Sequence, residues 1–259
     1  MYQDRDSDGQ RPMSSEPKPI GEVLQRALSK LDAASDDAAS KYDQLERDRD
    51  REDHNRELWE RLNLLNKDAG KQRAETSRFD LWKPDSKYQH EVAKKVSHWS
   101  STFSERELRQ EGLVLYGPVG TGKDHLAYAA ARMAIIMHGA RAVWANGREM
   151  AGMARDGIRE ETGDQWLISL ASVQLLIVSD PLPSLGELTT FQADALYRIY
   201  EKRNNRGMVT ITTINVADDA EADRRLGAAT WDRACHRAWK ICCRWPSHRK
   251  PSFELKPPA

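Results

Sequence analysis

The feature that most constrains this chain is a glycine-rich loop at residues 117–124, which reads Gly-Pro-Val-Gly-Thr-Gly-Lys-Asp. Glycines at this spacing let the backbone N–H groups before the lysine converge on one anion. Lys123 is expected to reach the β and γ phosphates of a nucleotide. The usual pattern continues with Ser or Thr, whose hydroxyl binds Mg²⁺, whereas this chain has Asp124. The loop therefore predicts a phosphate site that departs from the pattern at one chemically important position.

The segments around the loop support a phosphate site. Before it, Leu113–Tyr116 is a short apolar run typical of a buried strand, and residues 125–137 after it are rich in Ala, as in a helix packed on a sheet. A helix that begins at the loop adds the partial positive charge of its N-terminus. The alternative is a turn without a ligand, which needs neither three glycines nor this lysine. The residues expected to contact the nucleotide are Gly117, Pro118, Val119, Gly120, Thr121, Gly122, Lys123, Asp124 and His125.

Strand-like and helix-like segments alternate after the loop. We predict further strands at residues 140–145, 173–178, 208–214 and 240–245, and helices at 147–157, 162–171, 189–204 and 217–239. This alternation predicts an α/β fold of the P-loop NTPase type, in which helices sandwich a five-stranded, mainly parallel sheet. Such sheets bind ligands at the carboxyl ends of their strands.

The first third of the chain has a different composition. Residues 1–19 are polar and contain three prolines, so we expect them to be disordered. Residues 20–78 are predicted to form a helical extension, because apolar residues recur at three- and four-residue spacing before and after a charge-dense stretch. This extension is either a partner-binding arm or merely a soluble appendage. The nucleotide-binding core is predicted to span residues 79–259, and we expect its aromatic segment 79–84 to lie over that core.

Charge and cysteine content narrow the class of protein. The chain has 40 basic and 40 acidic side chains, so the net charge points to no particular partner. Its three cysteines lie near the C-terminus without metal-ligand spacing, as expected for reduced thiols. The first residues do not resemble a signal peptide, and the longest apolar run is too short to span a bilayer. We therefore expect a cytoplasmic protein that does not enter membranes.

Two polar residues follow predicted strands and are candidates for chemistry. Hydrolysis of a nucleoside triphosphate needs a phosphate cradle, a metal and a residue that orients water. Asp180, after the strand 173–178, is a candidate to bind the metal or to orient the attacking water. Asn215 is a candidate to hold that water or to contact the γ phosphate. The alternatives are a turn former before Pro181 for Asp180 and a strand-end cap for Asn215.

Three stretches make the chain resemble the AAA+ ATPases of the DnaC/IstB type, which are helicase loaders and transposition helper proteins. Residues 115–127 resemble that family's Walker A segment, and 175–180 resemble its Walker B strand. Asp232-Arg233 and the segment 245–249 resemble its C-terminal arginine-bearing elements. The resemblance implies ATP and Mg²⁺ as cofactors and an ATP-dependent homo-oligomer. It implies sensor roles for Asn215 and Arg249, and a role for Arg233 near a subunit interface beside the nucleotide. The implied catalytic set is Lys123, Asp180, Asn215 and Arg249.

The chain departs from the family pattern at three positions. Asp124 replaces the loop hydroxyl, Ser179 stands where the first Walker B acid is usual, and Ala229 lies where a trans-acting arginine is expected. The first two changes exchange a carboxylate and a hydroxyl that normally approach the same Mg²⁺. We therefore expect Asp124, Ser179 and Asp180 to hold the metal, and binding of the triphosphate to require it. Arg224 or Arg225 are candidates to replace the missing arginine.

Three functional interpretations remain open at this level. The first is an ATPase that acts in replication or transposition, whose N-terminal helices bind a helicase or a transposase and whose core binds single-stranded DNA. Basic residues and Trp231, Trp239 and Trp245 alternate in the segment 224–250, and Trp144 is a further candidate DNA contact, although all four rings also suit a core. The second is an adaptor that binds ATP without efficient hydrolysis. The third is a P-loop enzyme of another lineage, such as a small-molecule kinase, although an arginine-rich lid is not evident.

Overall fold

The computed structural model describes residues 52–53, 56–57, 76–147, 150 and 165–249. The chain divides into two compact units, Met1–Glu52 and Asp53–Ala259, and the fold described below belongs to the second. The predictions for residues 1–19, for most of 20–78 and for the helix at 147–157 lie outside the described residues. No helix within these ranges is both long enough and apolar enough to cross a bilayer.

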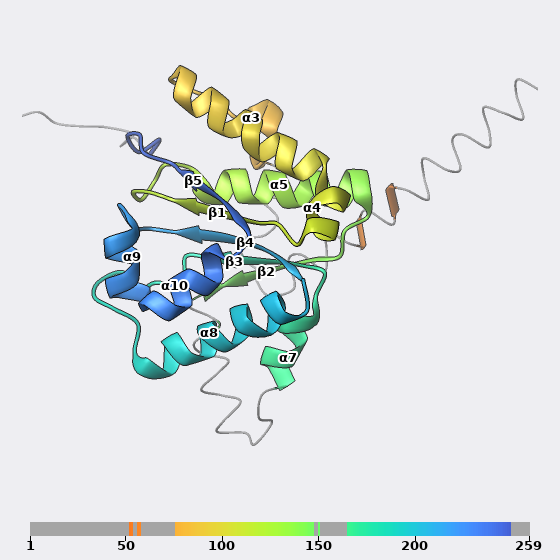
Figure 1. Ribbon diagram of the computed structural model, residues 1–259. Helices are drawn as coiled ribbons and strands as arrows, with labels where there is room; N and C mark the ends of the chain where they lie inside the picture. The colour runs from red at the N-terminus through yellow and green to blue at the C-terminus, as the bar shows by residue number, and fades with distance from the viewer. Residues whose placement is uncertain (1–51, 54–55, 58–75, 148–149, 151–164, 250–259) are drawn as a thin grey trace, which may run out of the picture. The chain divides into compact units, whose positions relative to one another are not determined.

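Five parallel strands form the sheet, in the order β2-β3-β4-β1-β5 (Figure 1). The predicted five-stranded parallel sheet is confirmed. The strands are β1 (Gly112–Tyr116), β2 (Ala142–Asn146), β3 (Leu175–Ser179), β4 (Val209–Ile214) and β5 (Ala238–Cys242).

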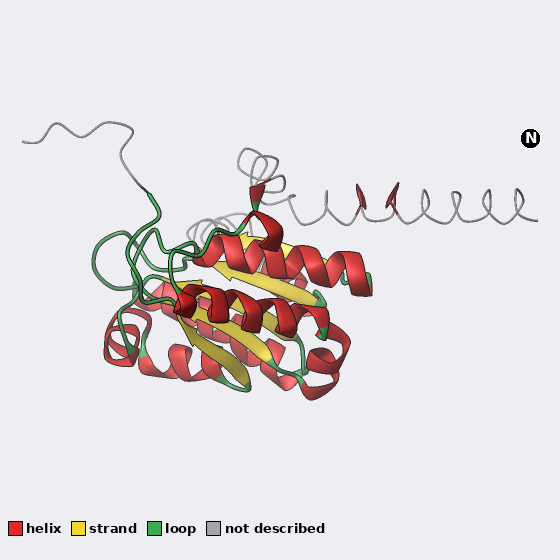
Figure 2. Cartoon of the chain, turned by 90° about the horizontal axis from the view of Figure 1, so that it is seen from above, coloured by secondary structure: helices red, strands yellow, loops and turns green. Residues whose placement is uncertain are grey.

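Helices cover both faces of the sheet (Figures 1 and 2). Alternate residues of β1 show the division: Leu113 and Leu115 enter one buried cluster with α3 and α5, and Val114 enters the other with α8 and α10. A short 3-10 helix, η1 (Phe79–Leu81), precedes them. The first face carries α3 (Lys87–Ser101), α4 (Phe103–Arg109) and α5 (Lys123–His138), and the second carries α7 (Gln165–Ser172), α8 (Thr190–Asn205), α9 (Asp219–Leu226) and α10 (Ala228–Cys235).

Two predicted elements near the C-terminus were wrong in extent. The single helix expected at 217–239 is the pair α9 and α10, which Gly227 separates with a φ of 91°. The fifth strand begins at Ala238 and ends at Cys242, so Trp245 lies beyond it. The chain leaves the sheet there because residues 243–249 cross over the glycine-rich loop, as described below.

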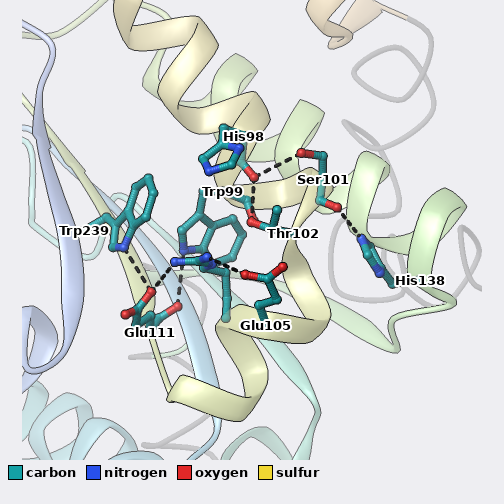
Figure 3. Close-up of polar contacts among 9 residues, drawn as sticks. His98, Trp99, Ser101, Thr102, Glu105, Glu111, His138 and Trp239 are labelled. Atoms are coloured by element: carbon teal, nitrogen blue, oxygen red, sulfur yellow. Dashed lines mark hydrogen bonds and ion pairs between the residues drawn. The ribbon is translucent and has the colours of Figure 1, made fainter.

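A polar cluster ties α3 and α4 to β5 (Figure 3). Arg106 forms an ion pair with Glu111, and the Trp239 Nε1–H donates to the same carboxylate over 3.2 Å. The Arg106 guanidinium also lies over the Trp239 ring, 5.1 Å from its centroid. Trp99 donates from Nε1 to the Glu111 carbonyl over 3.2 Å. The Trp239 ring is therefore held by Arg106 on one face and by Glu111 at its N–H group.

Candidate nucleotide-binding site

A cavity of about 800 Å³ opens at the carboxyl ends of β1, β3 and β4. This is the edge at which parallel sheets bind ligands. The structure brings together here most of the residues selected from the sequence. The cavity is lined by Val119, Gly120, Gly122, Lys123, Asp124, His125, Ser179, Asp180, Asn215 and Arg249, with Thr213, Arg225 and His248 among the further residues.

The glycine-rich loop has a backbone that side chains would obstruct. Gly120 and Gly122 both have a φ of 82°, in the left-handed region. A Cβ atom on Gly122 would lie 2.7 Å from the Trp82 ring, and one on Gly120 would collide with the Ser247 hydroxyl. The loop then enters α5 at Lys123. Residues of the loop and the N-terminus of α5 therefore line the cavity together, and a glycine-rich loop that opens a helix is the arrangement that binds phosphate.

The Lys123 ammonium points into its own loop. Nζ donates to the carbonyls of Gly117 over 2.9 Å and Pro118 over 2.6 Å. Burial lowers the pKa of this ammonium, because charge is costly away from water. Gly117, Pro118 and Thr121 do not line the cavity themselves, but Thr121 Oγ1 also bonds the Pro118 carbonyl. The loop carbonyls therefore hold the Lys123 ammonium at the wall of the cavity.

Asp124 is held by two hydroxyls from neighbouring strands. Its Oδ1 accepts hydrogen bonds from Ser179 Oγ over 3.1 Å and from Thr213 Oγ1 over 2.6 Å. Ser179 and Thr213 are also paired residues of β3 and β4. The expected approach of Asp124 and Ser179 is thus present in the structure. Thr213 was missed, although its place two residues before Asn215 on a strand that ends at the site was a usable signal.

Asp180 and Asn215 leave the ends of β3 and β4 and reach the same cavity. Asp180 has a φ of 45°, which is uncommon for a residue with a side chain, and its N–H donates to the Thr213 carbonyl over 3.0 Å. Such conformations occur at sites where the surrounding structure fixes them.

Arg225 binds carbonyl groups around the cavity. Its guanidinium donates to Pro183 O and Gly186 O over 2.9 Å each, and to Asn215 O over 3.1 Å. These bonds hold Arg225 within its own chain, so it does not project as a free arginine, whereas Arg224 is exposed. Arg225 joins the loop after β3 to the backbone of the predicted sensor residue.

The segment after β5 lies across the glycine-rich loop. Trp245 Nε1 donates to the Thr121 carbonyl over 2.9 Å, and the His248 N–H donates to the Gly120 carbonyl over 2.9 Å. These bonds bring Arg249 to the cavity. Trp82 completes the cover, with ring centroids 5.4 Å from His125 and 5.2 Å from His248. Phe79 and Trp82, from the aromatic segment expected to lie over the core, pack partly buried against the hydrophobic cluster that includes residues of α3 and α5.

Other candidate residues lie elsewhere. Arg233 lies on α10 with its guanidinium 6.0 Å from the Tyr197 ring, and it does not line this cavity. Its role near a subunit interface stays a prediction. Trp144, Trp231 and Trp245 are buried, at 1%, 5% and 8% exposure, so their rings are not available for base stacking in this conformation.

The oxygen atoms of the side chains that line the cavity are suitable ligands for a hard divalent cation. Asp124, Asp180 and the Ser179 hydroxyl offer only oxygen, the ligand type that Mg²⁺ prefers. The loop and α5 supply the phosphate cradle beside them. The residues present therefore fit ATP with Mg²⁺ in composition.

Comparison with known proteins supports a nucleotide at this site. A family model described as "IstB-like ATP binding protein" matches residues 21–253. The DnaC helicase loader is structurally similar, with a TM-score of 0.58 and 20% identity over 66% of this chain and 98% of that one. DnaI has a TM-score of 0.55 and 18% identity, over 69% of this chain and 93% of that one. AMPPCP-bound DnaA from Aquifex aeolicus has a TM-score of 0.53 and 16% identity, over 64% of this chain and 49% of that one. No curated protein matches the chain. At these identities the solved structures confirm the fold, while the family model covers most of the chain.

Proposed function

Because this chain belongs to the family of IstB-like ATP-binding proteins, we propose that it is an ATP- and Mg²⁺-dependent helper of DNA replication or transposition. The family membership makes nucleotide binding its basic property. The proposal adds the metal, the residues that hold it, the hydrolysis of ATP and the partners.

The observation that carries the proposal is the bond between Asp124 Oδ1 and Ser179 Oγ. The loop position that usually bears a hydroxyl bears the carboxylate, and the strand position that usually bears an acid bears the hydroxyl. Since the two side chains touch, the exchange leaves one carboxylate and one hydroxyl at the same place. With Asp180 beside them, Asp124 and Ser179 would hold Mg²⁺, which would neutralise charge on the β and γ phosphates.

The remaining residues have roles that follow from their places. Lys123 would turn from the loop carbonyls to the phosphates, and the N-terminus of α5 would support the same anion. Asp180 would orient the attacking water, and Asn215 would hold that water or contact the γ phosphate. Arg249 lines the cavity from the C-terminal side and would balance charge there.

The second candidate function is an adaptor that binds ATP as a switch and hydrolyses it poorly. The contacts of Arg225 favour this alternative, because an arginine bound to three carbonyls of its own chain does not complete a neighbouring site. Arg224, which is exposed, and Arg233, which is partly exposed, would then be candidates to contact a second copy in an ATP-dependent homo-oligomer.

The partners follow from the relatives. DnaC is described as a helicase loader, and we infer that a helicase or a transposase binds this chain through the N-terminal extension. Single-stranded DNA would bind through the basic side chains of the core. A pull-down of the helicase or transposase with the full-length chain, compared with a pull-down with a chain that lacks residues 1–78, tests the first inference. Binding that survives the deletion would contradict it.

ATP turnover, measured with and without Mg²⁺ and single-stranded DNA, tests the function itself. If the protein is an ATPase, turnover should depend on Mg²⁺ and disappear in Lys123→Ala. If it is an adaptor, ATP should bind tightly without turnover. The exposed Lys87, which does not line the cavity, provides the matched control Lys87→Ala. Absence of ATP binding in the wild type would contradict both candidates.

A further inference from the structure

A second hollow lies between α3 and the edge strand β5. It is a groove of about 570 Å³, lined by Lys94, Lys95 and His98 of α3 and by Trp239, Lys240 and Ile241 of β5. None of these residues lines the nucleotide cavity.

The strand in this groove has an open backbone edge. In the described part of the chain, β5 pairs with β1 alone. Arg237 O accepts from Gly112 N, and Cys243 N donates to Tyr116 O, so the odd-numbered residues of this stretch bond to β1. The N–H and C=O groups of Ala238 and Lys240 therefore point away from the sheet. Such an edge is a template for another strand.

Positive charge lies on one side of this edge. Lys94 and Lys95 are exposed on α3, and no carboxylate of the described residues forms an ion pair with either. The Lys240 side chain turns to the opposite face, where it pairs with Asp219 and lies 5.5 Å from the Tyr116 ring centroid. Along a strand added to β5, alternate side chains would therefore face α3 and its two lysines.

We propose that β5 and α3 form a docking site for an extended peptide segment of a partner protein that carries acidic side chains at alternate positions. Its backbone pairs with Ala238 and Lys240, and its carboxylates lie against Lys94 and Lys95. A nucleic-acid strand fits less well. The Trp239 ring is covered by Arg106 on one face, and a phosphodiester backbone lacks the N–H and C=O groups that would pair with the edge.

A labelled peptide that alternates Glu with Thr, titrated against the full-length protein, tests the proposal by fluorescence anisotropy. Lys94→Glu/Lys95→Glu should weaken its binding at least about tenfold, because two attractions become repulsions. Lys240→Pro should weaken it about fivefold relative to Lys240→Ala, since proline removes the outward N–H without touching the bonds to β1. The exposed pair Arg141→Glu/Arg206→Glu gives the matched charge control.

The outcomes separate the possibilities. Binding of the Glu peptide that is lost in both groove variants but kept in Lys240→Ala and in the control supports the site. The proposal is overturned if a Lys/Thr peptide binds as tightly as the Glu/Thr peptide, or if the Glu/Thr peptide does not bind. It is also overturned if Lys94→Glu/Lys95→Glu weakens the binding of oligothymidine and not that of the peptide. Thermal unfolding and ATP binding of each variant show whether it folds, and Lys94→Gln/Lys95→Gln repeats the test without charge reversal.

Discussion

The hydroxyl of Thr213 donates a hydrogen bond of 2.6 Å to Asp124 Oδ1 and so ties the first turn of α5 to β4. With the second bond from Ser179, the carboxylate is fixed at the place where the triphosphate would enter. A fixed carboxylate repels phosphate unless a cation lies between them. The metal dependence of nucleotide binding is therefore the property most directly governed by this contact.

Replacing Asp124 by Thr should strengthen ATP binding in the absence of Mg²⁺ by about tenfold, because the repulsive charge is removed. The gain should shrink when Mg²⁺ is added. Titration of a fluorescent ATP analogue with EDTA or with Mg²⁺ measures both. Asp124→Asn keeps the shape of the side chain and is the control for charge alone. If Asp124→Thr binds no better than the wild type without Mg²⁺, the repulsion argument is wrong.

Exchanging the two side chains tests whether they act as a pair. Ser179→Asp alone places a second carboxylate against Asp124 and should lower the melting temperature, since two neighbouring carboxylates cannot both ionise cheaply. Asp124→Thr/Ser179→Asp restores one carboxylate and one hydroxyl. We expect a coupling energy of about 1–2 kcal/mol in this cycle, together with recovered Mg²⁺-dependent binding. Strictly additive effects would show that the two positions are independent.

Arg225 is predicted to position the loop after β3. Arg225→Ala removes the bonds to Pro183, Gly186 and Asn215 and should weaken ATP binding or slow turnover about tenfold. Hydrogen exchange of residues 183–188 should become faster in the variant. The neighbouring exposed Arg224 provides the control Arg224→Ala, which should leave that exchange unchanged. Unchanged exchange in both variants would remove the positioning role.

The sequence predicted the parts of the site that follow from local pattern. The glycine spacing, the strand before it and the helix after it place Lys123 and Asp124, and the parallel sheet places Asp180 and Asn215 at the same edge. The position of Ser179 beside Asp124 could also be predicted, because the family resemblance implies that the side chains at these two positions approach each other.

What the sequence did not predict depends on contacts between distant segments. The pattern at 240–245 predicts a fifth strand that includes Trp245, but the strand ends at Cys242 and the Trp245 indole N–H donates to the Thr121 carbonyl of the glycine-rich loop. Arg203 has no distinguishing neighbours in sequence, yet it is fully buried among carbonyl groups of three segments. Arg225 likewise looks like a surface arginine until the loop it binds is placed. Periodicity does not report such long-range polar contacts.

Alkaline pH should destabilise the protein partly through Cys243. Burial raises the pKa of this thiol to about 12 from its ordinary 9.0. Between these values the unfolded thiol loses its proton while the folded one keeps it, so stability is present below 9.0 and falls as pH rises toward 12. Denaturant unfolding at about pH 8 and about pH 10 should show a smaller loss for Cys243→Ala than for the wild type. Cys242→Ala provides the control, because the half-buried Cys242 occupies the adjacent position in the chain. Identical pH dependence of wild type and Cys243→Ala would contradict the prediction.

Arg203 should be among the costliest side chains to remove. Its guanidinium, with no exposed surface, donates to Leu170 O over 2.9 Å, to Val173 O over 2.8 Å and to Val209 O over 2.5 Å, which joins α7, α8 and β4. Arg203→Met keeps much of the volume but leaves those carbonyls without donors, and should cost about 3 kcal/mol of unfolding free energy. Urea denaturation measures the loss. The side chain of the exposed Arg206, one turn further along, bonds only the Ser172 hydroxyl among the described residues, and Arg206→Met should cost less than about 0.5 kcal/mol. Equal losses in the two variants would mean that the buried carbonyl contacts do not stabilise the fold.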